Sequence, residues 1–588
     1  MLSEKEKRNV YLLLFPAIIT AFLNVVGVAF IAPFVAVASD PKAIAHYEKL
    51  AWVYHSMHFE TQRGFLLFLG VAVLIILILV NSLNAFTYWS TSYVILHARA
   101  SMATRLLTYY LSKPYVFFLD HNSASLMNNI FELVNRVTTG VLQACIGIVT
   151  AGLVILLIVS LLVIVNPLMA LGSMLIIGGA YGAIYISIRR KLNIISKHDV
   201  VAEEGSHLSV SESFGGIKDI KLFGCESQFI QRFSMPQYAL AKNRALFTGM
   251  QHVPKYALEV VAFGGVISLI IYMLSINKDF SAIMPTIALY VFAGYKLMPV
   301  IQQLFVHLTS LKSSYSALDV LYACLGGQSA SSNDEEPTPK KLLQFNDRLE
   351  LVKLSFMYPS SERLVLNAIS LNIKVNTTVG FIGTTGSGKT TLIDLILGLL
   401  TPTHGNIYVD GIEITSKNLQ QWQRSLGYVP QHIYLCDNSI ACNIAFGVPH
   451  DKIDMSAVMR AAKLAAIDDF VVSKLPNGYE TVIGERGVRL SGGQRQRIGI
   501  ARALYHDPSI LILDEATSAL DGTTEDVIME AIRNLGHKKT IVIVAHRLST
   551  VAECDHVYLL EDGEIIDQGV FSELAQRNSH LQQVASPC

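Results

Sequence analysis

Residues 383–391 read Gly-Thr-Thr-Gly-Ser-Gly-Lys-Thr-Thr, which has the residue types and the spacing of a loop that binds phosphate groups. An apolar run typical of a strand (379–382) precedes this glycine loop, and an apolar run typical of a helix (392–400) follows it. Glycines allow consecutive backbone N–H groups to turn toward phosphate oxygens, and the positive end of the following helix faces the anion. The sequence therefore predicts a nucleotide site between a strand and a helix, whereas a chance glycine-rich turn would lack these flanking elements.

The side chains of the glycine loop are expected to have distinct roles. Lys389 is expected to reach the β- and γ-phosphates, and Thr390 to offer its hydroxyl to Mg²⁺, because hard oxygen ligands suit that ion. The residues expected to surround the phosphates are Gly383, Thr384, Thr385, Gly386, Ser387, Gly388, Lys389, Thr390 and Thr391.

Residues 510–515 read Ile-Leu-Ile-Leu-Asp-Glu, a buried-strand pattern that ends in two carboxylates. Asp514 is suited to hold Mg²⁺ through water, and Glu515 to polarise an attacking water molecule. Such a run alone is weak support for a site. Because it follows the glycine loop in a region where strand patterns alternate with helical ones, we expect both to belong to one nucleotide site in an α/β domain with a largely parallel sheet.

The composition indicates what else the chain must contain. A chain of 588 residues is too long for one hydrophobic core, so we expect more than one domain. Hydrophobic residues make up 52% of the sequence and are concentrated before residue 325, which indicates a membrane domain there. The formal net charge of zero argues against a nucleic-acid partner. The seven cysteines are scattered without a CxxC pair, so neither a disulfide framework nor a zinc site is indicated.

Six long apolar segments predict six membrane-spanning helices. They cover residues 10–38, 64–93, 141–165, 168–188, 256–276 and 282–308. Lysine and arginine residues lie in the long connections after the second and fourth segments, whereas the connections after the third and fifth segments are short and nearly uncharged. The long connections are therefore expected in the cytoplasm, with both ends of the membrane domain on that side.

The connections contain further predicted helices. Glycine and polar breaks predict short transverse helices near residues 114–129 and 214–224, where the cytoplasmic connections could touch a cytosolic domain. Apolar residues at helical spacing near 41–60 predict an amphipathic helix on the outer membrane surface, with Trp52 and Tyr54 as interfacial anchors. The histidines in this stretch could instead bind a metal, although solvent-facing histidines are the interpretation that we favour.

The composition changes abruptly after residue 325 and divides the chain. Residues 1–325 are predicted to form the membrane domain with its six spanning helices, and residues 326–341 a linker rich in glycine, serine and proline. Residues 342–580 are predicted to form the α/β nucleotide-binding domain, followed by a short tail at 581–588.

Residues 490–494, Leu-Ser-Gly-Gly-Gln, resemble the signature sequence of ATP-binding cassette (ABC) proteins. The family's other elements stand around it in the family's order: Tyr358 as the adenine-stacking aromatic, Gln431 as the Q-loop glutamine, residues 481–487 as the exporter-type X-loop, residues 518–521 as the D-loop and His546 as the switch histidine. One membrane domain ahead of one cassette is similar to a half-transporter of the exporter class. The implied fold is an α-helical membrane domain fused to an α/β P-loop ATPase domain.

The resemblance implies an ATP hydrolase that works as a dimer with ATP and Mg²⁺ as cofactors. Two cassettes would meet head to tail, and each ATP would lie between the glycine loop of one chain and the signature of the other, formed by Ser491, Gly492, Gly493 and Gln494. Glu515 would be the general base, His546 would stabilise the transferring phosphoryl group, and Gln431 would belong to the catalytic residues and to the metal site. Because these positions all match the family's pattern, a homodimer is favoured over a heterodimer in which one member lacks the glutamate.

The membrane half resembles one group of exporters more closely. Residues 82–85, 254–259 and 295–299 are similar to the corresponding segments of the bacterial flippases of lipid-linked oligosaccharides used in protein glycosylation. This resemblance implies a multi-pass protein of the bacterial inner membrane that moves a polyprenyl-pyrophosphate oligosaccharide to the outer leaflet, with its nucleotide-binding domain in the cytoplasm. Alternatives are a flippase of another lipid, an exporter of drugs or peptides, and a subunit that binds ATP without transport; the intact Glu515 argues against the last.

Three ionisable residues in the last two predicted spans are candidates for substrate contact. Glu259 and Lys296 lie equally far from the turn between these spans, so they should lie at similar depth. Ionisable groups in apolar helices are costly unless they are paired or face a wet cavity. Two interpretations stay open: an ion pair between Glu259 and Lys296 that joins two helices, or a cavity in which Lys296 and Lys255 attract a pyrophosphate group.

Overall fold

The chain divides into two units by its contacts. The first comprises Met1–Lys113 and Phe117–Asn333, and the second comprises Pro114–Val116 and Asp334–Cys588. The structure, a computed structural model, describes residues 2–39, 48–275, 280–326, 343–359, 361–516, 525, 529–530, 538–545 and 548–578, although not every side chain within these ranges.

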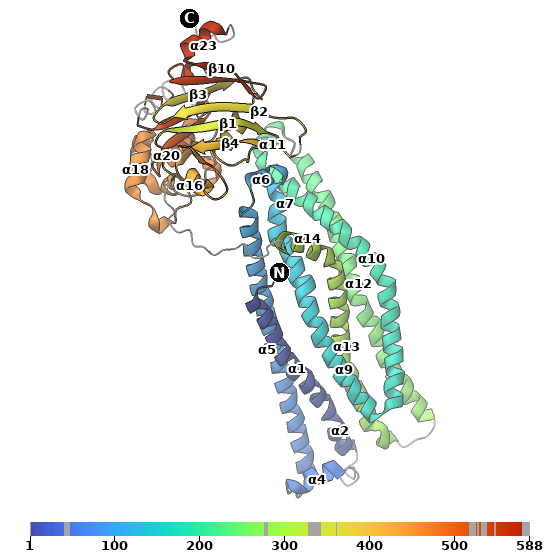
Figure 1. Cartoon of the computed structure of the whole chain (residues 1–588). Coiled ribbons are helices and arrows are strands. Elements are labelled where there is room, and N and C mark those ends of the chain that lie inside the picture. The colour runs from blue at the N-terminus through green and yellow to red at the C-terminus, as the bar shows by residue number, and fades with distance from the viewer. Residues whose placement is uncertain are drawn as a thin grey trace. The chain divides into compact units, whose positions relative to one another are not determined.

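The described residues of the first 326 are mostly helical. Three of the helices extend to about fifty residues each, and Figure 1 shows α9, α10, α12 and α13 lying lengthwise side by side, with α10 against α12 and α9 against α13. The elements are α1 (Glu4–Ala29), α2 (Ile31–Ser39), α4 (Glu48–Ser56), α5 (Gln62–Leu111), α6 (Tyr115–Asp120), α7 (Ser123–Asn128), the π-helical turn η1 (Asn129–Leu133), α8 (Val134–Val137), the π-helical turn η2 (Thr138–Gln143), α9 (Ala144–Val165), α10 (Pro167–Gly215), α11 (Ile217–Phe223), α12 (Glu226–Ser275), α13 (Phe280–Ser313) and α14 (Tyr315–Gly326).

Local sequence explains several helix ends. Ser3 and Glu6 form a capping box at the start of α1. Asn166 caps α10 by accepting a hydrogen bond from the backbone N–H of Met169, and Pro167 occupies the first turn, where no backbone donor is needed. α11 ends at Gly224, whose φ of 62° is readily adopted by glycine.

Four helical segments among the described residues are long and apolar enough to cross a membrane. They are Glu4–Ala38, Gln62–Leu111, Ser123–Val165 and Ile287–Ser313. These correspond to the first, second, third and sixth predicted spans. The fourth and fifth predicted spans, 168–188 and 256–276, fall within α10 and α12, where many side chains are outside the described residues.

Short helices lie where the sequence predicts them at the connections. The region near 114–129 contains α6 and α7, and the region near 214–224 contains α11. The predicted surface segment near 41–60 contains α4, and residues 40–47 lie outside the described residues. The predicted tail and nearly all of the predicted linker lie outside them as well.

The second unit contains two sheets. The smaller is antiparallel in the order β2-β1-β4-β5, and the larger has the order β10-β9-β3-β8-β7-β6. In the larger sheet all neighbours are parallel except β9 and β10. The strands are β1 (Arg348–Phe356), β2 (Leu366–Lys374), β3 (Thr378–Gly383), β4 (His404–Val409), β5 (Ile412–Glu413), β6 (Leu426–Val429), β7 (Ile510–Asp514), β8 (Thr540–Val544), β9 (His556–Glu561) and β10 (Glu564–Gly569).

Helices cover this sheet, which is why its central strands read as continuous apolar runs. Every residue of β7 and β8 is buried, and successive residues face two different hydrophobic clusters, with Leu511 and Leu513 in one and Ile510 and Ile512 in the other. The helices are α15 (Lys389–Ile396), α16 (Leu419–Gln423), α17 (Ile440–Ile444), α18 (Met455–Leu464), α19 (Asp468–Lys474), α20 (Gly492–Leu504), α22 (Leu548–Val551) and α23 (Phe571–Arg577), with 3₁₀ turns η3 (His450–Lys452), η4 (Gly478–Glu480) and η5 (Glu485–Gly487).

The parallel pairing sets the position of the candidate site. The carboxyl ends of β3, β8, β7 and β6 lie along one edge of the sheet, because these strands run in the same direction. Ligands of such sheets bind outside the carboxyl ends of the strands. The glycine loop follows β3, and Glu515 follows β7, so the largely parallel sheet predicted from the sequence brings both to this edge.

Candidate functional site

The glycine loop joins β3 to α15 through backbone conformations that require glycine. Gly388 has a φ of 99°, and a Cβ atom there would lie 3.1 Å from the carbonyl oxygen of Val365 and even closer to the side chain of Leu366. Gly383 has a φ of 151°, and a Cβ atom there would clash with the carbonyl oxygen of Leu560. The close approach of neighbouring backbone therefore excludes larger residues at both positions.

Lys389 lies inside the loop that it follows. It is 6% exposed, and its Nζ atom donates hydrogen bonds to the carbonyl oxygens of Gly383 at 2.8 Å and Thr384 at 2.9 Å. Burial lowers the pKa of the Lys389 ammonium, and the carboxylates of Glu515 and Asp514 act in the opposite direction. The ammonium is thus held on the inner side of the loop with the two carboxylates nearby.

Glu515 lies directly beyond β7 in a left-handed conformation with φ 49°, which is uncommon outside glycine, asparagine and aspartate. Its backbone N–H donates to the carbonyl of Val544 at 3.0 Å, and its Oε2 atom accepts a hydrogen bond of 2.6 Å from Nε2 of Gln431. Such a conformation costs about 1–3 kcal/mol and persists where surrounding contacts enforce it. The structure therefore brings together two residues that were both predicted to be catalytic.

Asp514, the last residue of β7, is 3% exposed and has two neighbours that the sequence analysis did not predict. Burial, and after it the charge of Asp514, raises the pKa of Asp394 on α15 to about 6. The same two causes raise the pKa of the Tyr428 hydroxyl on β6. Asp394 could have been noticed in the sequence, because it is an acidic residue within the apolar run that follows the glycine loop.

Tyr358 is joined to the helix that follows the loop. Its hydroxyl lies 3.2 Å from Oγ1 of Thr391, within hydrogen-bonding distance, and its ring packs edge-on against Phe356 with 4.9 Å between ring centroids. These contacts hold the ring of Tyr358 near α15, the helix that follows the glycine loop.

The donor set at this edge of the sheet fits Mg²⁺. Thr390 offers an exposed hydroxyl, Gln431 an amide oxygen and Asp514 a carboxylate, which are the oxygen ligands that the ion prefers. No group of three or more His, Cys, Asp and Glu side chains that could hold a metal occurs within the described residues. The ion would therefore need phosphate oxygens and water to complete its coordination.

Ser491 forms the N-cap of α20, and the signature residues are bonded among themselves. The backbone N–H of Ser491 donates to Oε1 of Gln494 at 2.8 Å, and the backbone N–H of Gln494 donates to Oγ of Ser491 at 3.2 Å. Ser491 is exposed, and no hydrogen bond within the described part of the chain joins Ser491 or Gln494 to the glycine loop. His546 and residues 518–521 lie outside the described residues.

In the first unit, Glu259 pairs with a residue other than Lys296, the partner that one interpretation expected. Its Oε1 atom lies 3.8 Å from Nζ of Lys255, one turn earlier on α12, and no ion pair of Lys296 occurs among the described residues. The described residues therefore show no Glu259–Lys296 ion pair between helices. The physical reason is local, since residues four apart on a helix lie within reach of each other.

The predicted similar depth of Glu259 and Lys296 agrees with the packing of α12 against α13. Nε2 of Gln302 lies 2.9 Å from Nδ1 of His252 and joins the two helices. Glu259 lies seven residues after His252 on α12. On the antiparallel α13, Tyr295 lies seven residues before Gln302 and is followed by Lys296. Glu259 and Lys296 are therefore at similar distances from the His252–Gln302 contact.

Comparison with known proteins gives two family matches. Residues 366–518 match the family described as ABC transporter, and residues 10–235 match the ABC transporter transmembrane region. A protein named ATP-dependent lipid A-core flippase from Ralstonia nicotianae is 31% identical over 494 residues, covering 82% of this chain and 80% of the relative. The protein of the same name from Pseudomonas aeruginosa is 31% identical over 482 residues, covering 80% and 77%.

The fold is also that of a solved exporter. A structure described as a bacterial Atm1-family ABC exporter with ATP bound aligns with a TM-score of 0.79 at 21% identity, covering 98% of this chain and 99% of that chain. The alignment spans both units, so the fusion of a helical membrane domain to a P-loop ATPase domain that the sequence predicts is confirmed.

Proposed function

We propose that this chain, which belongs to the ABC transporter family and couples ATP hydrolysis to transport, moves a lipid from the inner to the outer leaflet of a bacterial inner membrane. The observation that carries the proposal is the similarity to bacterial proteins named as lipid flippases, which extends over about four fifths of both chains. The apolar helices of the membrane domain are compatible with a substrate that never leaves the bilayer.

The proposed substrate is a polyprenyl-pyrophosphate oligosaccharide. Its support is the resemblance of residues 82–85, 254–259 and 295–299 to flippases of such lipids, together with Lys255 and Lys296, which could attract a pyrophosphate group. A second candidate is lipid A-core, which the names of the relatives favour.

The proposed roles at the nucleotide site are supported by the contacts described above. Lys389 and the loop amides would hold the phosphates of ATP, and Thr390, Gln431 and Asp514 would hold Mg²⁺. When bound, the ion neutralises charge on the β- and γ-phosphate oxygens. Glu515 would take a proton from the attacking water while Gln431 keeps its carboxylate in position through the 2.6 Å hydrogen bond.

The proposal includes a homodimer. The exposed N-cap of α20, formed by Ser491 and Gln494, would meet the glycine loop of a second copy and complete each ATP site. The positive end of α20 would then face the γ-phosphate. A single chain would therefore lack half of each site.

Transport in liposomes tests the function and the substrate together. The purified protein is reconstituted with a labelled polyprenyl-pyrophosphate oligosaccharide, labelled lipid A-core or labelled phosphatidylcholine, and the leaflet of each label is measured with and without ATP. The proposal expects ATP-dependent movement of the first lipid. Movement of lipid A-core alone would support the second candidate, and movement of none would contradict a flippase function.

A further inference from the structure

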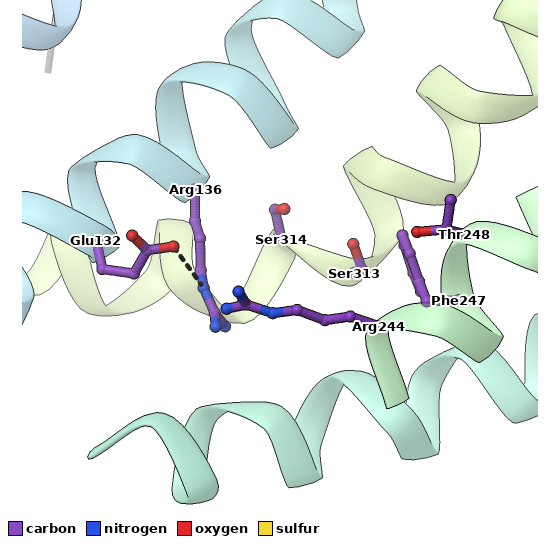
Figure 2. A pocket seen from close by; sticks show the side chains of 7 residues that line it. All are labelled: Glu132, Arg136, Arg244, Phe247, Thr248, Ser313 and Ser314. Carbon is purple, nitrogen blue, oxygen red and sulfur yellow. Dashed lines mark ion pairs between the residues drawn. The ribbon is translucent and has the colours of Figure 1, made fainter. Parts of the chain in front are cut away.

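A cavity of about 210 Å³ lies in the first unit, at a junction of helices that no motif pointed to. Its lining comes from three parts of the chain, as Figure 2 shows: η1 and α8, the middle of α12, and the junction between α13 and α14. The lining residues are Glu132, Arg136, Arg244, Phe247, Thr248, Ser313 and Ser314. The volume is below that of sites for drug-sized ligands, so the cavity suits one small chemical group.

The helical backbone is irregular in the wall of the cavity that carries Arg136. α8 is a single helical turn between the π-helical turns η1 and η2, and such turns are frequent at functional sites. Gly140 in η2 packs directly against Ser314, where an added Cβ atom would overlap the serine side chain. This close packing fixes the distance between the Arg136 wall and the α13–α14 junction.

Among the described side chains, the lining carries two positive charges and one negative charge. Nε of Arg136 lies 3.9 Å from Oε1 of Glu132, and these side chains are 22% and 33% exposed. Figure 2 shows the guanidinium groups of Arg136 and Arg244 pointing toward each other from different helices. Both arginines also make other interactions.

Hydroxyl groups complete the lining. Ser314 is 9% exposed, and its hydroxyl makes no hydrogen bond within the described residues. A guanidinium has donors and no acceptor, and hydroxyl groups can also donate. The lining therefore offers many donors to a ligand that has several acceptor oxygens.

We infer that this cavity binds a phosphoryl group, held by Arg136 and Arg244 and by the Ser314 hydroxyl. A phosphoryl group has three or more acceptor oxygens, and the arginine fork matches two of them at once. A carboxylate has only two oxygens and would leave one arginine or the serine unused. Glu132 would remain paired with Arg136 and keep that side chain in the cavity.

The position of the cavity suggests where the phosphoryl group comes from, and this step depends on the proposed lipid function. Ser313 ends the apolar span 287–313, at the side that the sequence predicts to be cytoplasmic. Basic cavities between membrane helices on that side are suited to lipid headgroups. Arg244 precedes Lys255 on α12 by eleven residues, about 16 Å along the helix. The cavity would thus receive a headgroup phosphate before it reaches Lys255.

Binding of inorganic pyrophosphate tests the site. The parent protein carries Lys389→Ala, so that the glycine loop does not compete, and is studied as the full chain in phosphatidylcholine nanodiscs. Arg244→Gln, on an exposed side chain, is expected to weaken pyrophosphate binding about tenfold or more, and Ser314→Ala severalfold. Lys312→Gln removes an exposed charge next to the cavity and is expected to leave the affinity unchanged.

Two results would overturn the inference. Equal pyrophosphate affinity in the parent, Arg244→Gln and Ser314→Ala proteins would overturn the inference. A lower melting temperature of Arg244→Gln combined with unchanged binding by Ser314→Ala would also overturn it, because a purely structural arginine gives that pattern.

A second titration identifies the source of the phosphoryl group. Nanodiscs that contain undecaprenyl pyrophosphate should show weaker apparent binding of inorganic pyrophosphate if the lipid occupies the cavity. Unchanged binding would assign the cavity to a soluble phosphoryl compound. If no lipid moves in liposomes but pyrophosphate binding still depends on Arg244, the proposed lipid function fails and the phosphoryl site stands.

Discussion

Replacing Glu515 by glutamine keeps the shape of the side chain and removes its negative charge. Glutamine retains an oxygen that can accept the hydrogen bond from Gln431, and the backbone bond from residue 515 to Val544 is independent of the side chain. The bond from Gln431 changes from charge-assisted to neutral, a loss of about 1 kcal/mol at most at this exposed position. We therefore expect the variant to fold and to bind ATP as the wild type does.

Hydrolysis should respond very differently. An amide cannot accept a proton from water at neutral pH, so a general-base contribution of about 10²–10⁴ is lost, which corresponds to about 3–5 kcal/mol of activation free energy. The assay compares phosphate release with the binding of a fluorescent ATP analogue in the same preparation. Hydrolysis within about threefold of the wild type at equal affinity would refute the assignment of Glu515 as the base.

Three further predictions concern assembly, pH and substrate. A mixture of Lys389→Ala and Gly492→Asp subunits should show more ATPase activity than either variant alone, because a mixed dimer keeps one intact composite site; dimers without this gain would argue against shared sites. The pKa of Asp394 is raised to about 6, so the folded cassette should lose stability as the pH rises from about 4 to 6, where the unfolded chain ionises more readily. Discounted for partial exposure, the effect is about 1–2 kcal/mol, and denaturant unfolding without nucleotide or Mg²⁺ should find no such loss in Asp394→Asn. Lys255→Ala should abolish lipid transport and substrate-stimulated hydrolysis but leave basal ATPase activity. Glu259→Gln removes only the ion-pair partner of Lys255 and should keep transport. Equal loss of transport in the two variants would indicate that the pair is structural.

The nucleotide site was largely predictable because its chemistry depends on local sequence. The glycines at 383 and 388 have backbone conformations that exclude other residues, and the capping box of Ser491 and Gln494 is a short-range pattern. The apolar run of β7 indicated a buried parallel strand, and its burial on both faces confirms this. The left-handed conformation of Glu515 was not predictable, because it depends on contacts with a neighbouring strand that comes later in the chain.

The membrane domain was less predictable because its details depend on contacts between distant segments. The π-helical turns on either side of α8 accompany the packing of Gly140 against Ser314, and no local pattern predicts that contact. The pairing of Lys255 with Glu259 was available from their spacing of four residues, but a partner on another helix was considered instead. The raised pKa of Asp394 likewise depends on long-range packing, which buries its carboxyl group and places Asp514, from a strand far along the chain, beside it.

The most direct test of the account is a measurement of lipid orientation in sealed proteoliposomes. A fluorescent polyprenyl-pyrophosphate oligosaccharide is reconstituted with the wild type or with Glu515→Gln, and its accessibility to a membrane-impermeant quencher is followed after ATP is added outside. We expect ATP to change the accessible fraction with the wild type and to leave it unchanged with Glu515→Gln. Equal changes with both proteins, or none with either, would contradict transport driven by hydrolysis at this site.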